Sequence, residues 1–173
     1  ADKNDKNEVF SSSTFKAMEL RNIGPAYMSG RIADIAVDQN NPSTWYTAVG
    51  SGGVWKTTNA GTTWTPIFDD QPVYSIGDVT IAPSNSNIIW VGTGENNGGR
   101  HISFGDGVYK SLDGGQTWKN MGLKKSEHVS DIIIHPTNPD IVWVSAQGPL
   151  WSGGGERGLY KTTDGGETWK QVL

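Results

Sequence analysis

Residues 107–118 read GVYKSLDGGQTW, and this stretch decides the fold because it recurs twice in the chain. Residues 53–64 read GVWKTTNAGTTW, and residues 158–169 read GLYKTTDGGETW. Each copy leads from an apolar strand into a turn of the form Ser/Thr-x-Asp/Asn-x-Gly-x-Thr-Trp. In such a turn the Asp or Asn oxygen accepts backbone N–H bonds and the glycine adopts a positive φ. The copies therefore predict three similar β-hairpins, each closed by a tryptophan that packs against the sheet to which its hairpin belongs.

A second repeat precedes each hairpin. Residues 34–37, 78–81 and 131–134 read DIAV, DVTI and DIII, and each is followed by an Asn/Pro/Ser turn and an aromatic-containing run. Four short strands thus fit into each period of roughly 50 residues, which is typical of propeller blades. The sequence predicts an all-β fold: a β-propeller segment of three four-stranded antiparallel blades with Asp-box hairpins, preceded by an outer strand.

The repeats also divide the chain. We predict a disordered polar tail (1–14) and a partial propeller (15–173) made of an outer closing strand (15–30), blade 1 (31–69), blade 2 (70–122) and blade 3 (123–173). Residues 20–24, LRNIG, match the outer strand of blade 2 at 118–122, WKNMG. Blade 3 already has an outer strand, so the N-terminal one is predicted to complete a later blade. Since propellers have about four to eight blades, either the chain is part of a longer one, which we favour, or copies complete one another.

Composition excludes several classes of protein. The formal net charge is −4, and no basic stripe indicates nucleic-acid binding. The chain has no cysteine for a disulfide framework or thiolate metal site. No apolar run approaches the roughly 18 residues of a membrane helix, so no membrane insertion is expected. The polar opening, ADKNDKNE, predicts a processed, exported protein, extracellular or in the cell envelope, or a cut end.

The hairpins resemble the Asp-box, or bacterial neuraminidase, repeat. Together with residues 30–32 (GRI), 92–95 (GTGE) and 148–151 (GPLW), they make the chain similar to the sortilin-type propeller family. It is more closely similar to large secreted bacterial members labelled glycosyl hydrolases. The resemblance covers roughly residues 15–173 and implies a many-bladed propeller. It also implies that Asn59, Asp113 and Asp164 of the boxes serve the fold and lie away from any binding site.

Loop lengths indicate where function lies. With strands A to D counted from the axis outward, the A–B turns are uniform, at 38–43, 82–87 and 135–140. The B–C connections differ, at 50–52, 93–106 and 146–157. Variable loops on a constant scaffold usually carry function. The face formed by the B–C and D–A connections is therefore the predicted functional surface.

Ligand-binding candidates on this face are Arg31, Arg100, His101, Trp151 and Arg157. Three of the four arginines fall here, one per blade. They could converge to grip a carboxylate through fork-like bonds, as in sialidases. Alternatively each arginine pairs locally and holds its own loop, which we favour. Trp151 either stacks on a sugar ring or fills a gap between blades.

Catalytic candidates are the loop carboxylates Glu95, Asp106 and Glu156, none of them compelling. Glycoside hydrolysis needs two carboxylates about 5–10 Å apart. Similarity to the propeller xyloglucanases implies an Asp before the Gly-Gly of the first B–C turn, but here Ser51 precedes Gly52. Hydrolysis by this segment alone is not expected.

No metal or cofactor is predicted. The histidines lack a metal-ligand spacing. Asp34, Asp78 and Asp131 recur on strand A and either ring the central channel as a cation site or, as we favour, bond backbone between blades.

The main functional prediction is an exported binding module for a protein partner or a glycan. The alternatives are a glycoside hydrolase with catalytic residues partly in other blades and a structural subunit of an envelope assembly. Further partners would be the remaining blades of a longer chain or copies of this one, with no nucleic acid.

Overall fold

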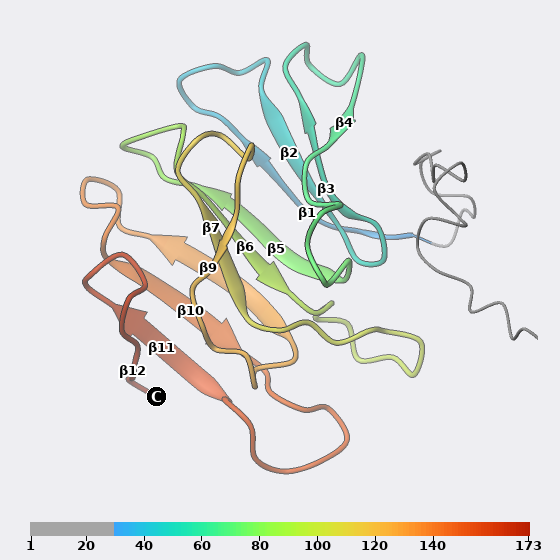
Figure 1. The fold of residues 1–173 in the computed structure, drawn as a ribbon, viewed down its shortest axis with the longest axis vertical. Coiled ribbons are helices and arrows are strands. Elements are labelled where there is room, and N and C mark those ends of the chain that lie inside the picture. The colour runs from blue at the N-terminus through green and yellow to red at the C-terminus, as the bar shows by residue number, and fades with distance from the viewer. Residues whose placement is uncertain (1–29) are drawn as a thin grey trace, which may run out of the picture.

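A computed structural model describes residues 30–173, in which twelve strands form three four-stranded antiparallel sheets and no helix (Figure 1). Blade 1 consists of β1 (Ile32–Val37), β2 (Trp45–Val49), β3 (Gly53–Thr57) and β4 (Thr65–Pro66). Blade 2 consists of β5 (Ile76–Ile81), β6 (Ile89–Thr93), β7 (Val108–Ser111) and β8 (Lys119–Asn120). Blade 3 consists of β9 (Val129–Ile134), β10 (Val142–Ala146), β11 (Gly158–Thr162) and β12 (Lys170–Gln171). The all-β fold of three such blades is confirmed. The predicted tail (1–14) and all of the predicted outer strand (15–30) except Gly30 lie outside the described residues.

Each sheet follows chain order, so every strand pairs with its neighbours in sequence. The outer strands β4, β8 and β12 begin one residue after the Asp-box tryptophan, whereas the sequence placed that tryptophan in the strand. The pairing of each innermost strand with the next shifts register immediately before its aspartate, at Asp34, Asp78 and Asp131. This recurring bulge bends the inner strand where the blades approach one another.

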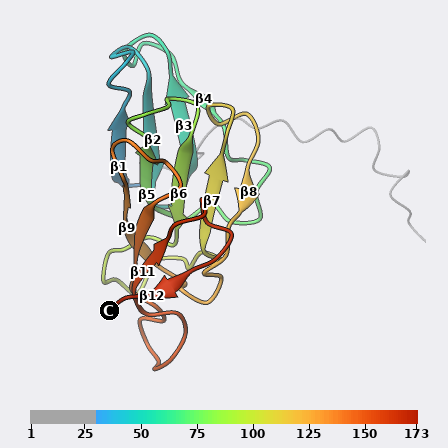
Figure 2. The ribbon, with the colours of Figure 1, turned by 90° about the vertical axis from the view of Figure 1, so that its left-hand side faces the viewer.

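The three blades lie side by side, with blade 2 in the middle (Figure 1). Seen from the side, β1, β5 and β9 lie toward one edge of the molecule and β4 and β8 toward the other (Figure 2). All five residues of β6 are buried because blades 1 and 3 cover both faces of its sheet. In contrast, Ile32, Ile35 and Val37 of β1 are exposed, since no described residue covers that face of blade 1.

Two hydrophobic cores fill the spaces between the blades. Ile89 and Val91 of β6 belong to the core between blades 1 and 2, together with Tyr46 and Val54. Trp90 points the other way, into the core between blades 2 and 3. The alternation of a β-strand thus places successive residues of one strand in different cores.

The Asp box forms as predicted. In blade 2, Asp113 Oδ1 accepts backbone N–H bonds from Gln116 and Thr117, both 2.9 Å long, and Oδ2 accepts one from the Thr117 hydroxyl. These bonds hold the pKa of Asp113 well below its usual range. Gly114 and Gly115 have φ values of 69° and 91°, which glycine adopts readily.

The box tryptophan, however, does not pack only against its own blade. The Trp118 indole N–H donates to the Ile67 carbonyl of blade 1 at 2.7 Å, and its ring meets Phe68 edge-on at 5.2 Å. Trp169 donates in the same way to the Met121 carbonyl of blade 2. Besides lying against its own turn, the tryptophan of blades 2 and 3 thus joins its blade to the preceding one, a contact that the sequence did not predict.

A close approach of backbone between blades 2 and 3 gives a stability prediction. A Cβ added to Gly77 of β5 would lie 2.0 Å from the Val129 carbonyl oxygen and 2.6 Å from that of Gly94. Gly77→Ala is therefore expected to destabilise the protein by about 2 kcal/mol, measured by urea denaturation, because backbone has to move. Gly98→Ala is the control, since nothing lies within 4 Å of its added Cβ. Equal stability of the two variants would contradict this packing.

Candidate functional site

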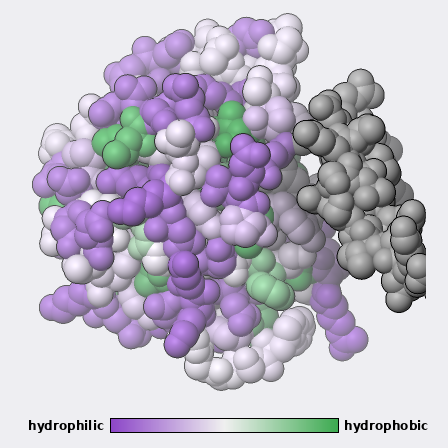
Figure 3. Space-filling view, viewed as in Figure 1, coloured by the Kyte–Doolittle hydropathy of each residue, from purple (hydrophilic) through white to green (hydrophobic). Residues whose placement is uncertain are grey.

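The loops that connect strands B with C and strands D with A form one face of the three blades, at the lower right of Figure 1. The B–C connections cover residues 50–52, 94–107 and 147–157. Those of blades 2 and 3 begin one residue later than predicted, and that of blade 2 also ends one residue later. Seen from the direction of Figure 1, the surface is largely hydrophilic, with separate hydrophobic patches (Figure 3).

Arg31 and Glu95 form an ion pair between blade 1 and the long loop of blade 2. The Arg31 guanidinium donates through Nε and one terminal nitrogen to the two carboxylate oxygens of Glu95. The Asn97 amide donates a further bond to Glu95 Oε1 at 3.1 Å. A Cβ added to Gly50 would lie 2.7 Å from the Glu95 carboxyl carbon, so glycine at position 50 leaves room for the pair.

Glu95 is therefore a poor catalytic acid. Its side chain is fully buried, although it was selected as a residue of a surface loop. The bonds from Arg31 hold the pKa of Glu95 below its usual value, so the carboxylate stays ionised. Its backbone is held too, because the Glu95 N–H donates to Ser75 Oγ at 3.0 Å and its carbonyl contacts His128 Nδ1 at 2.8 Å. We assign Glu95 the role of fixing this loop.

The other two loop carboxylates, Asp106 and Glu156, differ in the hydrogen bonds that their oxygens accept. Asp106 Oδ2 accepts a bond from the Tyr109 hydroxyl at 2.8 Å, but its buried Oδ1 has no partner among residues 30–173. Glu156 Oε2 accepts the Lys125 N–H at 2.8 Å and so ties the blade 3 loop to the connection before β9. Asp106 is thus the catalytic candidate with a buried, unpartnered oxygen in the part of the chain that the structure describes.

The arginines do not assemble into one clamp. Arg31 is engaged by Glu95, and Arg157 donates to the carbonyls of Pro149 and Ser152 within its own loop. The guanidinium of Arg100 forms no bond to the described residues. Arg157 therefore holds its own loop, as the favoured alternative has it, whereas Arg31 bridges two blades.

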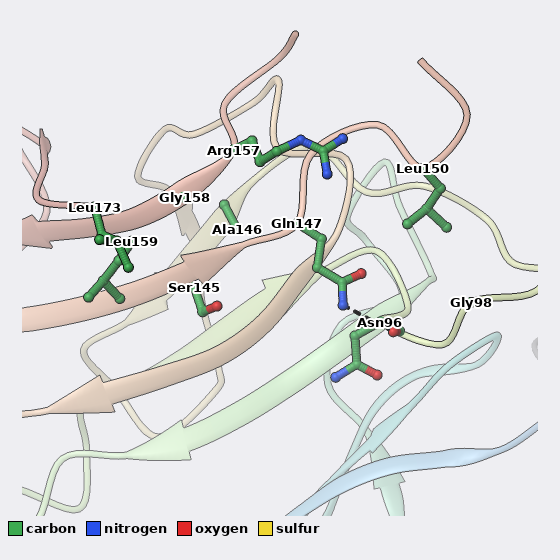
Figure 4. A pocket seen from close by; sticks show the side chains of 10 residues that line it. All are labelled: Asn96, Gly98, Ser145, Ala146, Gln147, Leu150, Arg157, Gly158, Leu159 and Leu173. Carbon is green, nitrogen blue, oxygen red and sulfur yellow. Dashed lines mark hydrogen bonds between the residues drawn. The ribbon is translucent and has the colours of Figure 1, made fainter. Parts of the chain in front are cut away.

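A shallow hollow of about 620 Å³ lies on this face beside blade 3 (Figure 4). Gln147 Nε2 donates to the Asn96 carbonyl at 3.2 Å across its floor, and the buried Gln147 Oε1 has no partner within residues 30–173. Leu150 and Arg157 border it on the loop side (Figure 4). The lining combines amide groups with aliphatic side chains.

Three aromatic side chains project from the same set of loops. Trp151 is 75% exposed, Phe104 is 69% exposed and Tyr74 is 59% exposed. The Tyr74 hydroxyl lies 3.3 Å from Ser103 Oγ, which joins the D–A and B–C loops of neighbouring blades. His101 is exposed in the loop that also carries Phe104. Trp151 and His101 are among the residues predicted from the sequence, whereas Phe104 and Tyr74 are not, although each is an aromatic residue in a loop of this face.

Two of the three strand-A aspartates, Asp34 and Asp78, connect successive blades. Val79 N–H donates to Asp34 Oδ2 at 3.3 Å, and the backbone of Ile132 in blade 3 interacts with the Asp78 carboxyl and lowers its pKa. This is the backbone bonding between blades that we favoured. Burial, followed by the negative charges of Asp34 and Asp131, raises the pKa of Asp78 to about 8. Across residues 30–173 there is no group of three or more His, Cys, Asp or Glu arranged to hold a metal ion.

Comparison with known proteins shows the family to which the chain belongs. A family model described as "Sortilin-Vps10: Sortilin, neurotensin receptor 3" matches residues 52–173, more than half of the chain. The chain belongs to the Sortilin-Vps10 family. No helix among the described residues of this family member is long and apolar enough to cross a membrane.

The chain is similar to a xyloglucanase and to an enzyme of the GH74 group. The chain is 26% identical over 176 residues to xyloglucanase Xgh74A of Acetivibrio thermocellus, covering 82% of this chain and 20% of that protein. It therefore spans about a fifth of the length of the curated relative. The GH74 enzyme of Niastella koreensis is 28% identical with a TM-score of 0.58, over 79% of this chain and 20% of that one.

Two more distant structures share the fold alone. An ancestral GH74 enzyme has a TM-score of 0.64 at 21% identity, over 82% of this chain and 18% of that one. YCF48 bound to D1 peptide has a TM-score of 0.54 at 16% identity, over 82% of this chain and 39% of that one. This Sortilin-Vps10 member is thus a propeller segment related to glycoside hydrolases.

Proposed function

We propose that these blades are part of a polysaccharide-hydrolysing propeller and that their contribution is to bind the glycan on the B–C/D–A face. The observation that carries the proposal is the exposure of Trp151, Phe104 and Tyr74 on that face. Aromatic rings present flat apolar surfaces with a polar edge, which suits the C–H faces of pyranose rings. The amides of Asn96 and Gln147 in the adjacent hollow supply donors and acceptors for hydroxyl groups.

The engaged arginines support a neutral glycan over an acidic one. Arg31 already binds the carboxylate of Glu95, and Arg157 binds two carbonyls of its own loop. A sialic-acid site that grips the carboxylate with three converging arginines would need these guanidiniums free, whereas of the three only Arg100 has no bond to the described residues. Similarity to a xyloglucanase makes xyloglucan the first neutral polymer to test.

Hydrolysis itself requires an acid and a base or nucleophile. Glu95 is ionised and buried, and Glu156 bonds a backbone N–H, so neither is placed to transfer a proton. Asp106 retains one unpartnered oxygen. We propose that the catalytic pair includes at least one carboxylate beyond residues 30–173. Because a polymeric substrate of this kind is met outside the cytoplasm, we propose that the protein acts outside the cell or in the cell envelope.

Affinity electrophoresis in gels containing xyloglucan tests glycan binding by the chain. We expect retardation by xyloglucan, none by dextran, and an affinity about tenfold lower for Trp151→Ala, because truncating an aromatic anchor removes its whole stacking surface. Leu112→Ala is the control: Leu112 is 65% exposed but lies in an Asp-box turn on the opposite face. Unretarded parent protein, or equal retardation of parent and Trp151→Ala, would contradict the proposal. Unretarded parent protein would instead favour a protein ligand for this face, and equal retardation would mean that Trp151 does not contact the glycan.

A further inference from the structure

Asn97 and Gly98 are consecutive residues in the long B–C loop of blade 2, between β6 and β7. Nowhere else in the sequence does a glycine follow an asparagine. Neither residue belongs to a strand, and both are exposed. Asparagine is among the thermolabile residues, and a following glycine, which has no Cβ, lets its backbone nitrogen approach the asparagine side chain. The pair therefore has the sequence that favours attack of the backbone on the side-chain amide.

The structure leaves the attacking nitrogen free. The Gly98 N–H donates no hydrogen bond within residues 30–173. A Cβ added to Gly98 would meet no heavy atom within 4 Å, so there is open space beside the backbone at this point. In the described part of the chain the Asn97 amide forms one bond, from Nδ2 to Glu95 Oε1 at 3.1 Å. Both the nitrogen that would attack and the amide that would be lost are thus accessible.

The preceding residue, Asn96, provides a contrast within the same loop. Its Nδ2 donates to the Ser130 carbonyl at 3.2 Å, and its own carbonyl accepts a bond from Gln147 Nε2 at 3.2 Å. Blade 3 therefore holds Asn96 at its side chain and at its backbone. The residue that follows it also carries a side chain, which hinders the approach of the backbone nitrogen. Asn96 should be stable under conditions in which Asn97 reacts.

We propose that Asn97 is a site of spontaneous deamidation, which converts it to aspartate or isoaspartate and loosens the loop. The Gly98 nitrogen attacks Asn97 Cγ, a carbon–nitrogen bond forms while the nitrogen loses its proton, and the Cγ–Nδ2 bond breaks with release of ammonia. Water then opens the cyclic imide at either carbonyl. Water is consumed and ammonia is released, with no change of oxidation state. The proposal does not depend on the proposed glycan binding.

The loosening follows from the partner of the Asn97 amide. Glu95 is fully buried and its carboxylate is bonded to Arg31 of blade 1. A carboxylate at position 97 cannot donate to Glu95 Oε1 and repels it instead. The new charge would also lie beside the hollow, because Gly98 is one of its lining residues (Figure 4). Deamidation therefore weakens the contact that ties this loop to blade 1.

Peptide mapping by mass spectrometry, after incubation of the folded chain at mildly alkaline pH, tests the reaction. Fragmentation of the peptide should show a carboxyl group at position 97 while Asn96 remains an amide. Gly98→Ala should slow the change by about tenfold or more, since the added methyl group hinders closure of the imide. The folded loop has room for that methyl group, and the φ of Gly98 is not positive. Deamidation no faster at Asn97 than at Asn96, or equally fast in parent and Gly98→Ala, would overturn the proposal.

Limited proteolysis tests the effect on the loop. Trypsin cleaves after arginine, and Arg100 is exposed in the same loop with no guanidinium bond to the described residues. Asn97→Asp carries the charge of the modified residue and should be cut after Arg100 about threefold faster than the parent, or more. Asn85→Asp makes the same charge change at an exposed asparagine in an A–B turn and should be cut like the parent. Equal rates for Asn97→Asp and Asn85→Asp would overturn the loosening of the loop.

Discussion

Replacing Trp118 with alanine is expected to lower the free energy of unfolding by about 3 kcal/mol. The ring packs edge-on against Phe68 at 5.2 Å, and its N–H bonds the Ile67 carbonyl, so truncation opens a cavity between two blades and leaves that carbonyl unpaired. Trp118 is only half-buried, which places the loss at the low end for a tryptophan. Urea denaturation followed by fluorescence of the remaining tryptophans measures it.

Trp64→Ala is the matched control, because Trp64 occupies the same place in the Asp box of blade 1. Its ring contacts Trp45 of its own blade, with centroids 6.4 Å apart, and its N–H has no acceptor among the described residues. We expect Trp64→Ala to lower the free energy of unfolding by about 1 kcal/mol or less. Equal losses for the two variants would mean that Trp118 does not join two blades.

The stability of the folded chain should also depend on the protonation of Asp78. Burial and the nearby carboxylates raise its pKa to about 8, whereas an aspartate in the unfolded chain titrates near pH 3.9. Between these values the folded state holds a proton that the unfolded state has released. The contribution of Asp78 to stability is therefore complete below about pH 4, falls as pH rises, and levels off above about pH 8. The total loss is on the order of a few kcal/mol.

Asp78→Asn tests this because asparagine has nearly the same shape and does not titrate. As the pH rises from 5 to 8, the unfolding free energy of Asp78→Asn should increase relative to that of the parent. Asp70→Asn, at an exposed aspartate, should show no such shift. If the difference between Asp78→Asn and the parent is constant with pH, Asp78 is not held protonated.

Much of the fold could be predicted from the sequence because its signals are local. The Asp box needs an acceptor, a glycine and a tryptophan within eight consecutive positions, such as 111–118, and all three copies form the predicted turn. The alternation in β6, which sends Trp90 to one core and Ile89 to the other, likewise follows from strand geometry.

The contacts between blades could not be predicted from local sequence patterns. The acceptor of Trp118 lies 51 residues away, and nothing in the local pattern distinguishes Ile67 from its neighbours. The burial of Glu95 was missed because its partner, Arg31, is 64 residues away, so that a carboxylate in a polar loop resembles a surface group. Loop length indicated the functional face, whereas the arrangement of its side chains depends on these distant contacts.

The candidate glycan face depends on contacts of its loops with neighbouring elements. The Arg31–Glu95 pair and the bond between Glu156 and Lys125 each tie a B–C loop to a different element. The loops that carry Phe104 and Trp151 are therefore held from their bases while the aromatic side chains remain exposed. Rigid loops lower the entropy cost of binding a long, flexible polymer.

Hydrogen exchange of the indole N–H groups, followed by NMR, decides whether the Asp-box tryptophans of blades 2 and 3 join successive blades. We expect slow exchange for Trp118 and Trp169, whose N–H groups bond carbonyls of the preceding blade, and fast exchange for Trp64. Exchange of Trp118 and Trp169 as fast as that of Trp64 would contradict this contact between blades.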